Sequence, residues 1–394
     1  MRSAINSAGL SKNALRCTTL NNPEVPPLVD DTRSQDELFH AAFAILCNAI
    51  AKRAFPSASV AVTLQNRLVA LKAFGTHTYE GDSPAVSPAT IFDVASLTKV
   101  VASTTIAMLL YQRGLLDLEA PVDAIVPEFI ADSAKDVRRR DVTIHMLLAH
   151  SSGLPAYAKL FLQNKNREPL LHAAFTTPLT AEPGSRAEYS DIGFIILGFA
   201  LERIADEPLD SFSKRELFAP LGMIDTGFNP PRAIRECIAP SADDRIFRKR
   251  IIQGEVQDEN ASVMGGVAGH AGIFATAADL ARFGNAMANA SGSILRPETI
   301  ALFTRRETTP VGTSRALGWD TPSSASQSGK YFGDSSFGHL GYTGTSLWVD
   351  PTPQLSITLL TNRTWPDCSS QAIKQVRPAF HDAVIEAIKS GGRP

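Results

Sequence analysis

The stretch Ile91-Phe92-Asp93-Val94-Ala95-Ser96-Leu97-Thr98-Lys99-Val100 holds a hydroxyl and an amine three residues apart. On a helix this spacing places Ser96 and Lys99 on one face, close enough for their side chains to interact. The mostly apolar residues from Val100 to Gln112 predict such a helix, which Gly114 ends. Ser96 is then expected in the first helical turn, where free backbone N–H groups favour negative charge. These features make Ser96 a candidate nucleophile, activated by the lysine.

The Ser-x-x-Lys spacing is weak evidence alone, because the chain repeats it at Ser211 and Lys214. Nothing near this second pair indicates catalysis. The rest of the sequence has to distinguish the two.

Composition restricts the class of protein. The chain has 394 residues, of which 44% are hydrophobic and 20% charged, and this is typical of a globular protein with a large core. The formal net charge of −2 argues against a nucleic-acid-binding protein. The four cysteines are widely spaced, without a C-x-x-C pair, and no H-E-x-x-H motif occurs. We therefore expect no disulfide scaffold, no metal site and no cofactor.

Two patterns bear on location. No segment approaches the roughly 18 consecutive apolar residues of a membrane span. The first 30 residues contain no continuous apolar segment typical of a secretory signal. The sequence as written predicts a cytoplasmic protein, and a periplasmic or secreted one if the true start lies elsewhere.

Strand patterns occur at both ends of the chain. Residues 60–64 and 68–71 flank a polar turn and predict a β-hairpin, and residues 345–349 and 355–360 predict two further strands. Helical spacing of apolar residues follows residue 35 and recurs over residues 371–389. We predict an α/β protein of the α+β type, in which both termini build one antiparallel sheet with flanking helices.

The middle of the chain is rich in helical patterns. Thr143 and Thr276 are placed as N-caps before apolar segments, and residues 192–204 form another apolar helix. The expected organisation is a loosely ordered tail at 1–34, a sheet domain from 35–95 and 295–394, and a mostly helical domain at 96–294. The active site is expected at the interface of the two domains.

A serine nucleophile needs a base and two N–H groups that stabilise the oxyanion. The ordinary pKa of lysine is about 10.4, so Lys99 can act as a base only if its surroundings lower that pKa. Tyr189, within Glu188-Tyr189-Ser190-Asp191, is a candidate partner that could share the role, although a packing role is the default interpretation of this residue taken alone. The chain contains no G-x-S-x-G motif, and this absence argues against an α/β-hydrolase. For the histidines at 145, 150 and 270 a structural role is the default interpretation.

Three motifs in order resemble the penicillin-binding-protein and serine β-lactamase superfamily: Ser96-Leu97-Thr98-Lys99, Tyr189-Ser190-Asp191 and His339-Leu340-Gly341. The form of the second motif is similar to class C β-lactamases and to the related family VIII carboxylesterases. The segments at 143–155 (TIHMLLAHSSGLP), 221–226 (LGMIDT), 266–281 and 341–346 also resemble family segments. The resemblance extends from about residue 35 to residue 390.

The resemblance implies a role for each matching residue. Ser96 would be acylated, and Lys99 and Tyr189 would pass its proton. The backbone N–H groups of Ser96 and Tyr342 would form the oxyanion hole. Gly341 would let the backbone approach the substrate closely.

Two departures from the family pattern concern substrate binding. Asp191 replaces the usual amide, and a carboxylate there would keep Lys99 protonated and repel an anionic substrate. His339 and Leu340 stand where the family has a lysine and a hydroxyl residue, and histidine is a weaker cation at neutral pH. In penicillin recognition these positions hold the substrate carboxylate. We therefore expect weakened binding of β-lactams and of D-Ala-D-Ala termini.

The expected function is that of a serine hydrolase with an acyl-enzyme intermediate and a small-molecule ester or amide substrate. Among such enzymes, a carboxylesterase is the preferred hypothesis. One alternative is a β-lactamase or D-Ala-D-Ala carboxypeptidase. A non-catalytic binding protein of the same fold is a third possibility, which the presence of Ser96, Lys99 and Tyr189 together disfavours.

Overall fold

The computed structural model describes residues 28–131, 136–289 and 294–391. The principal sheet has the strand order β1-β3-β2-β11-β10-β9. Its strands are β1 (Val29–Asp30), β2 (Ser57–Leu64), β3 (Arg67–Gly75), β9 (Phe337–Leu340), β10 (Ser346–Asp350) and β11 (Leu355–Thr361). Strands β2 and β11 pair antiparallel in the centre of the sheet, with Val62 opposite Ile357. The prediction of one sheet built from both ends of the chain is therefore confirmed.

The hairpin of β2 and β3 is also confirmed. Its two turn residues, Gln65 and Asn66, have φ values of +48° and +64°. Such values suit a two-residue hairpin turn, whose twist matches that of the flanking strands.

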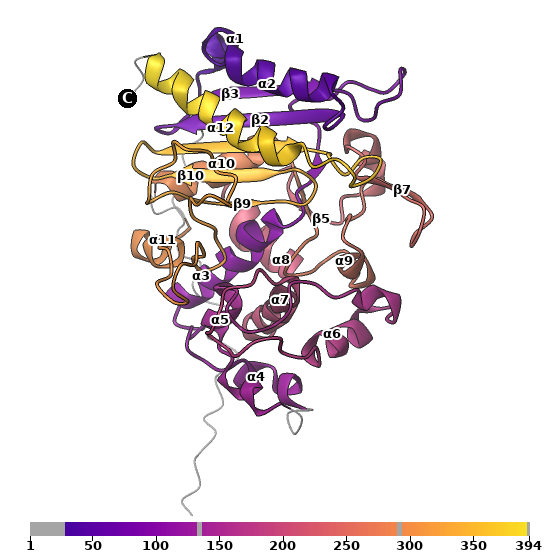
Figure 1. The fold of residues 1–394 in the computed structure, drawn as a ribbon, viewed down its shortest axis with the longest axis vertical. Coiled ribbons are helices and arrows are strands. Elements are labelled where there is room, and N and C mark those ends of the chain that lie inside the picture. The colour runs from indigo at the N-terminus through magenta and orange to yellow at the C-terminus, as the bar shows by residue number, and fades with distance from the viewer. Residues whose placement is uncertain (1–27, 132–135, 290–293, 392–394) are drawn as a thin grey trace, which may run out of the picture.

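Helices cover both faces of this sheet (Figure 1). Helices α1 (Gln35–Leu38), α2 (His40–Ala51) and α12 (Ile373–Ser390) lie on one face, and α10 (Ala277–Asn289) lies on the other. Trp348 and Ile357 belong to the core with α2 and α12, whereas Leu347 and Val349 belong to the core with α10. This division follows from the alternation of side chains along a strand.

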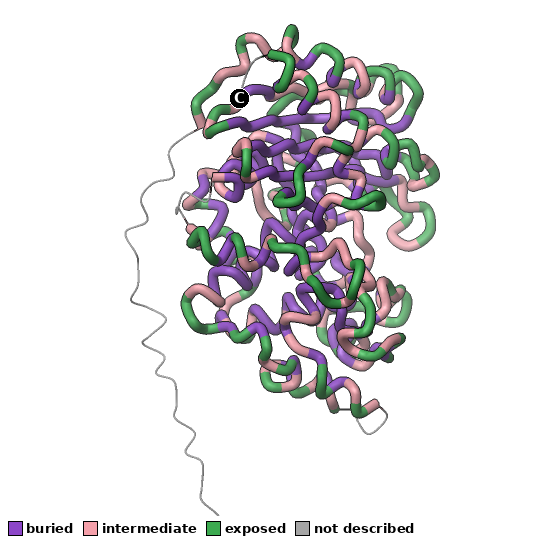
Figure 2. The backbone as a smooth tube through the Cα atoms, turned by 60° about the vertical axis from the view of Figure 1, so that its left-hand side comes forward, coloured by how far each residue is buried: buried purple, intermediate pink, exposed green. Residues whose placement is uncertain are grey.

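The remaining helices form the lower part of the molecule in Figure 1, with a buried centre that Figure 2 shows. They are α3 (Thr105–Gln112), α4 (Val122–Ile125), α5 (Ile144–Leu148), α6 (Arg167–Phe175), α7 (Asp191–Ala205), α8 (Leu209–Ser213), α9 (Glu259–Val263) and α11 (Pro297–Thr304). The expected N-caps are present: the Thr143 hydroxyl accepts the Met146 N–H at 3.2 Å, and the Thr276 hydroxyl accepts the Asp279 N–H at 3.2 Å.

Two small sheets complete the fold. The first has the order β4-β8-β5 and joins β4 (Phe92–Asp93), β8 (Ile273–Ala275) and β5 (Gly227–Phe228). The second pairs β6 (Ala242–Asp244) with β7 (Arg250–Ile252). Strand β4 directly precedes Ser96, so its pairing with β8 anchors the stretch that carries the candidate nucleophile.

The helix expected after Ser96 is present, but it opens with wider turns than an α-helix. Residues Lys99–Thr104 are π-helical and α3 follows. The Thr105 hydroxyl donates a 2.8 Å hydrogen bond to the carbonyl of Val100, five residues earlier. Short π-helical turns inside helices are frequent at functional sites.

The division into domains remains a prediction. Residues 1–27 of the expected tail lie outside the described residues, and Val29–Asp30 form β1, parallel to β3. Helix α10 falls within the range assigned to the helical domain, yet it packs on the sheet, where Gly284 lets it approach Ser356.

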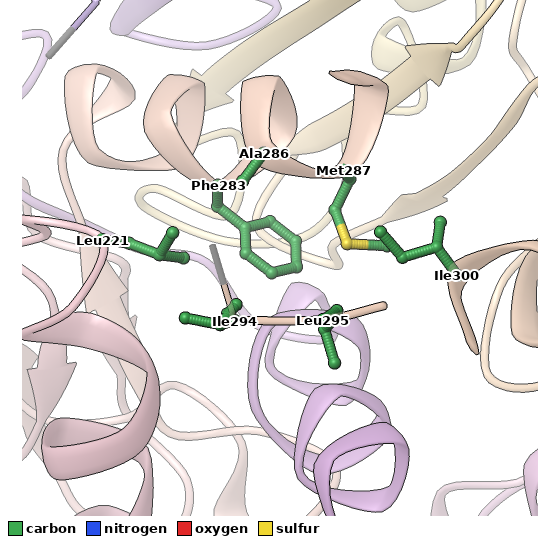
Figure 3. Close-up of a pocket in the computed structure, with 7 residues that line it drawn as sticks. All are labelled: Leu221, Phe283, Ala286, Met287, Ile294, Leu295 and Ile300. Atoms are coloured by element: carbon green, nitrogen blue, oxygen red, sulfur yellow. The ribbon is translucent and has the colours of Figure 1, made fainter. Parts of the chain in front are cut away.

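Within the described residues, no helix combines the length and the apolar character needed to cross a membrane. A pocket beneath α10 is lined by apolar side chains only, and none of them is a candidate site residue (Figure 3).

Candidate active site

Ser96 lies in a sharp turn between β4 and the helix that carries Lys99. The preceding residue, Ala95, has a φ of +49°, a conformation that costs a residue with a side chain about 1–3 kcal/mol. The Asp93 carboxylate accepts the Ala95 N–H at 2.8 Å and the Gln257 N–H at 2.6 Å. These hydrogen bonds and the pairing of β4 hold the turn in place and present the Ser96 hydroxyl.

Lys99 is fully buried, and its ammonium group is saturated with partners. Its Nζ lies 3.0 Å from Ser96 Oγ, 2.6 Å from Asp191 Oδ1 and 3.1 Å from the carbonyl oxygen of His270. Three acceptors match the three donors of a protonated lysine. The spacing predicted from the sequence therefore does bring Ser96 and Lys99 into contact.

Tyr189 completes the group, because its hydroxyl donates a 2.8 Å hydrogen bond to Ser96 Oγ. It lies just before α7, where the Ser190 hydroxyl accepts the Gly193 N–H at 3.0 Å and caps the helix. Lys99 Nζ is 4.8 Å from the centre of the Tyr189 ring. The structure thus brings together four of the predicted site residues, Ser96, Lys99, Tyr189 and Asp191.

The surroundings set the protonation states of this group. Burial alone would lower the pKa of Lys99, but the negative charge of Asp191, and then Tyr189, raises that pKa above its ordinary value. Burial, and then the charge of Asp191, raises the pKa of the Tyr189 phenol, and Lys99 only partly opposes this rise. At neutral pH the resting site therefore contains an ammonium group and a neutral phenol.

The third motif lies on β9, the edge strand of the principal sheet. The His339 side chain is buried, and its Nδ1 lies 2.8 Å from the carbonyl oxygen of Leu340. Burial, together with the charges of Lys99 and Arg315, places the pKa of His339 well below its ordinary value. The sequence suggested a weak cation here, but the imidazole is neutral.

Gly341 and Tyr342 follow β9, and Gly341 lies against Val94 of the Ser96 turn. A Cβ atom on Gly341 would lie 1.9 Å from Thr345 Oγ1 and 2.5 Å from the carbonyl oxygen of Val94, so only glycine fits. Within the described residues, the backbone N–H groups of Ser96 and Tyr342 donate to no backbone carbonyl. The two N–H groups expected to form an oxyanion hole therefore make no backbone hydrogen bond within this part of the chain, and they are available to a substrate oxygen.

Sequence reasoning missed two features of the site. The Arg315 guanidinium lies 5.4 Å from the centre of the Tyr189 ring, and a distance of 3.7 Å separates it from the Asp320 carboxylate. The buried His270 ring places Nε2 2.8 Å from Asp258 Oδ1, while its carbonyl oxygen contacts Lys99. No sequence motif identifies Arg315, because a long loop brings it to the site. His270, in contrast, lies in the family-like segment 266–281, which was a signal for it in the sequence.

The second Ser-x-x-Lys pair lacks the burial and the hydrogen-bond partners of the first. Ser211 and Lys214 are both exposed, and the Ser211 backbone N–H and hydroxyl both bond to the neighbouring Asp210. Within the described residues, no cluster of three or more His, Cys, Asp or Glu side chains is suited to a metal ion.

A family model described as Beta-lactamase matches residues 42–377. The chain belongs to the Beta-lactamase family. A protein of Salmonella agona, provisionally named a D-alanyl-D-alanine carboxypeptidase, is 32% identical over 345 residues, which cover 78% of this chain and 79% of the relative. An N-acetylmuramyl-L-alanine amidase of Bacillus subtilis is 32% identical over 343 residues, covering 78% and 77% of the two chains.

Solved structures of low sequence identity share the fold. EstCE1, a hydrolase with promiscuous acyltransferase activity, superposes with a TM-score of 0.72 at 22% identity and covers 89% of this chain and 99% of its own. The penicillin-binding protein homologue of Pyrococcus abyssi gives a TM-score of 0.69 at 21% identity and covers 88% and 77%. The relatives are serine hydrolases, and so is this protein by family membership.

Proposed function

We propose that Ser96 is the nucleophile of an acyl-enzyme hydrolase whose best substrates are neutral carboxylic esters. The observation that carries the proposal is the Ser96 hydroxyl, held between Lys99 Nζ at 3.0 Å and the Tyr189 hydroxyl at 2.8 Å. A serine so placed can lose its proton to one neighbour while the other donates a proton to the leaving group.

In the first half of the reaction, Ser96 Oγ attacks the substrate carbonyl carbon and its proton passes into the Lys99–Tyr189 pair. Because Lys99 is protonated at rest, its proton has to pass to the Asp191 carboxylate, 2.6 Å away, before the amine can accept that of Ser96, and this transfer adds to the barrier. The N–H groups of Ser96 and Tyr342 stabilise the oxyanion, and each such donor is worth about 3–4 kcal/mol of barrier. The pair then protonates the leaving alcohol, and water releases the acyl group by the same steps in reverse.

The charges around Ser96 support a neutral substrate. Asp191 places a carboxylate beside the nucleophile, and the buried His339 is neutral. A substrate carboxylate near these groups would meet repulsion from Asp191 and no compensating cation at His339. A β-lactam is therefore expected to be a poor substrate.

A D-Ala-D-Ala carboxypeptidase is the second candidate, and one observation favours it. Among the residues that the structure describes, Arg315 has a long ion pair of 3.7 Å with Asp320 and lies beside the Tyr189 ring, so a terminal carboxylate could reach its guanidinium. The provisional name of the Salmonella agona relative agrees with this alternative.

A pocket of about 430 Å³ lies near Tyr342, one of the residues of the proposed oxyanion hole. Asp243, Arg245 and Glu259 help to line it, and so does Cys368, which is next to the Tyr342 side chain. Ala242, Ile246 and Pro366 also line it, so this pocket does not by itself select between polar and apolar leaving groups.

A substrate panel tests the proposal. Purified wild type and Ser96→Ala are compared on p-nitrophenyl acetate, a chromogenic cephalosporin and a D-Ala-D-Ala peptide. We expect kcat/KM for the ester to exceed that for the cephalosporin at least tenfold, and Ser96→Ala to be inactive on all substrates. Faster hydrolysis of the peptide than of the ester would contradict the proposed esterase activity and support a D-Ala-D-Ala carboxypeptidase.

A further inference from the structure

We propose that His150 is a positioning residue that holds the Tyr189 hydroxyl against Ser96. This inference rests on the proposed role of Ser96 as the nucleophile. His150 itself does not touch Ser96; it acts on the two backbone groups next to Tyr189 and on the face of its ring.

Two hydrogen bonds to His150 hold the chain on either side of Tyr189. The Ser190 N–H donates to His150 Nδ1 at 3.0 Å, and the Glu188 N–H donates to the His150 carbonyl oxygen at 2.8 Å. One residue thus fixes the backbone immediately before and after the tyrosine. Such a clamp restricts the direction in which the phenol points.

The imidazole ring adds a third contact. Its centre lies 4.7 Å from that of the Tyr189 ring and 5.0 Å from that of Phe194, a residue of α7. The side chain is 2% exposed, so it is a buried support behind the tyrosine. Its contact with Phe194 ties that support to the rigid helix that Tyr189 precedes.

The clamp requires a neutral imidazole with a defined tautomer. Nδ1 accepts a hydrogen bond from a backbone N–H, so the ring proton is assigned to Nε2. Two cations face His150, Arg315 from the loop before β9 and Lys99 from the nucleophile helix, and the neutral imidazole of His339 also lies near it. Burial first, and then these charges, lowers the pKa of His150 well below its ordinary value, which keeps the ring neutral.

The backbone explains how His150 reaches this position. Helix α5 ends at Leu148, and His150 adopts a φ of +56°, which turns its ring toward the Tyr189 segment. Asparagine tolerates this left-handed conformation well. Its Oδ1 atom also falls near the position of a histidine Nδ1 and can accept the Ser190 N–H.

Two variants therefore separate the clamp from simple packing. His150→Asn keeps the acceptor, whereas His150→Gln carries its amide farther along the side chain, away from the Ser190 N–H. If His150→Gln does not fold, His150→Gly replaces it, because glycine lacks the acceptor and adopts a positive φ without strain.

The experiment measures kcat and KM for p-nitrophenyl acetate, and the rate of Ser96 labelling by a fluorophosphonate, in a double-mutant cycle with Tyr189→Phe. We expect His150→Gln to lower kcat by about 10- to 100-fold, with KM changed less than about twofold, and His150→Asn to recover most of this loss. In the Tyr189→Phe background, His150→Gln should cost less than about threefold, since the residue it positions is already impaired.

Equal losses in both backgrounds would overturn the positioning role, and so would a glutamine variant as active as the asparagine one. Labelling of Ser96→Ala at the wild-type rate would contradict the proposed nucleophile instead. The two failures are therefore distinguishable.

Discussion

The Lys99 ammonium group lies closer to the Asp191 carboxylate, at 2.6 Å, than to the Ser96 hydroxyl, at 3.0 Å. The lysine that is expected to activate the nucleophile is therefore held protonated by a carboxylate at its side. This relationship distinguishes the site from one with an amide at the same position. It also makes Asp191 the residue through which substrate choice and activation of Ser96 are coupled.

Asp191→Asn should change the choice of substrate. The variant lacks the negative charge that raises the pKa of Lys99, so burial lowers this pKa below its value in the wild type. The variant also no longer repels an anionic substrate. We expect kcat/KM for a cephalosporin to rise about tenfold relative to that for p-nitrophenyl acetate. This change corresponds to the loss of about 1.4 kcal/mol of repulsion between the Asp191 and substrate carboxylates. Asp210→Asn, which removes a carboxylate on α8 away from the site, is the control. An unchanged ratio would remove Asp191 from the account of specificity.

Tyr189→Phe should abolish most of the activity and leave the fold intact. The variant keeps the ring contacts with His150 but loses the hydroxyl that lies 2.8 Å from Ser96 Oγ. Loss of a general acid or base lowers kcat by about 10²- to 10⁴-fold. Tyr111→Phe, on α3, is the matched control, because Tyr111 packs against Phe303 outside the site. Activity of Tyr189→Phe close to that of the control would show that the phenol only packs.

Gly341→Ala should disturb the proposed oxyanion hole. The new methyl group would overlap Thr345 Oγ1 and the carbonyl oxygen of Val94, forcing β9 away from the Ser96 turn. We expect a loss of about 1–3 kcal/mol in the free energy of unfolding, together with a lower kcat. Gly81→Ala is the control, since a Cβ there has no atom within 4 Å. Urea unfolding and ester hydrolysis measure both effects, and equal behaviour of the two variants would contradict the prediction.

Stability should fall in acid partly through His381, which lies buried under β10. Burial lowers its pKa from 6.5 to about 4. Between these values the unfolded chain binds a proton that the native protein does not, so the free energy of unfolding decreases as the pH falls. The full contribution of His381 is roughly 3 kcal/mol.

Urea unfolding near neutral pH and near pH 4 checks this prediction. His381→Gln should reduce the difference in unfolding free energy between the two conditions, whereas His40→Gln, at an exposed histidine, should leave it unchanged. The same pH dependence in both variants would mean that His381 is not responsible.

Local patterns predicted much of the fold. The alternation of apolar residues located β2, β3, β10 and β11, and the hydroxyl residues at 143 and 276 marked helix starts. The order of the three motifs correctly indicated the Beta-lactamase family. These features depend on residues close in sequence or on spacing along one element, which a single chain reveals.

The surroundings of the site residues could not be predicted in the same way. The positive φ of Ala95 and the approach of Arg315 to Tyr189 arise from contacts between distant segments. Gly269, in the family-like segment 266–281, has a packing role that the resemblance does not show: a Cβ there would lie 2.2 Å from the carbonyl oxygen of Phe194. The charge state of His339 likewise depends on burial, which its motif does not encode.

The most direct test of the central claim is the mass of the protein after reaction with a fluorophosphonate, followed by mapping of the modified peptide. The account predicts a single adduct on Ser96, absent from Ser96→Ala and unchanged in Ser211→Ala, which alters the second Ser-x-x-Lys pair. An adduct that persists in Ser96→Ala, or that maps to another residue, would contradict the assignment of Ser96 as the nucleophile.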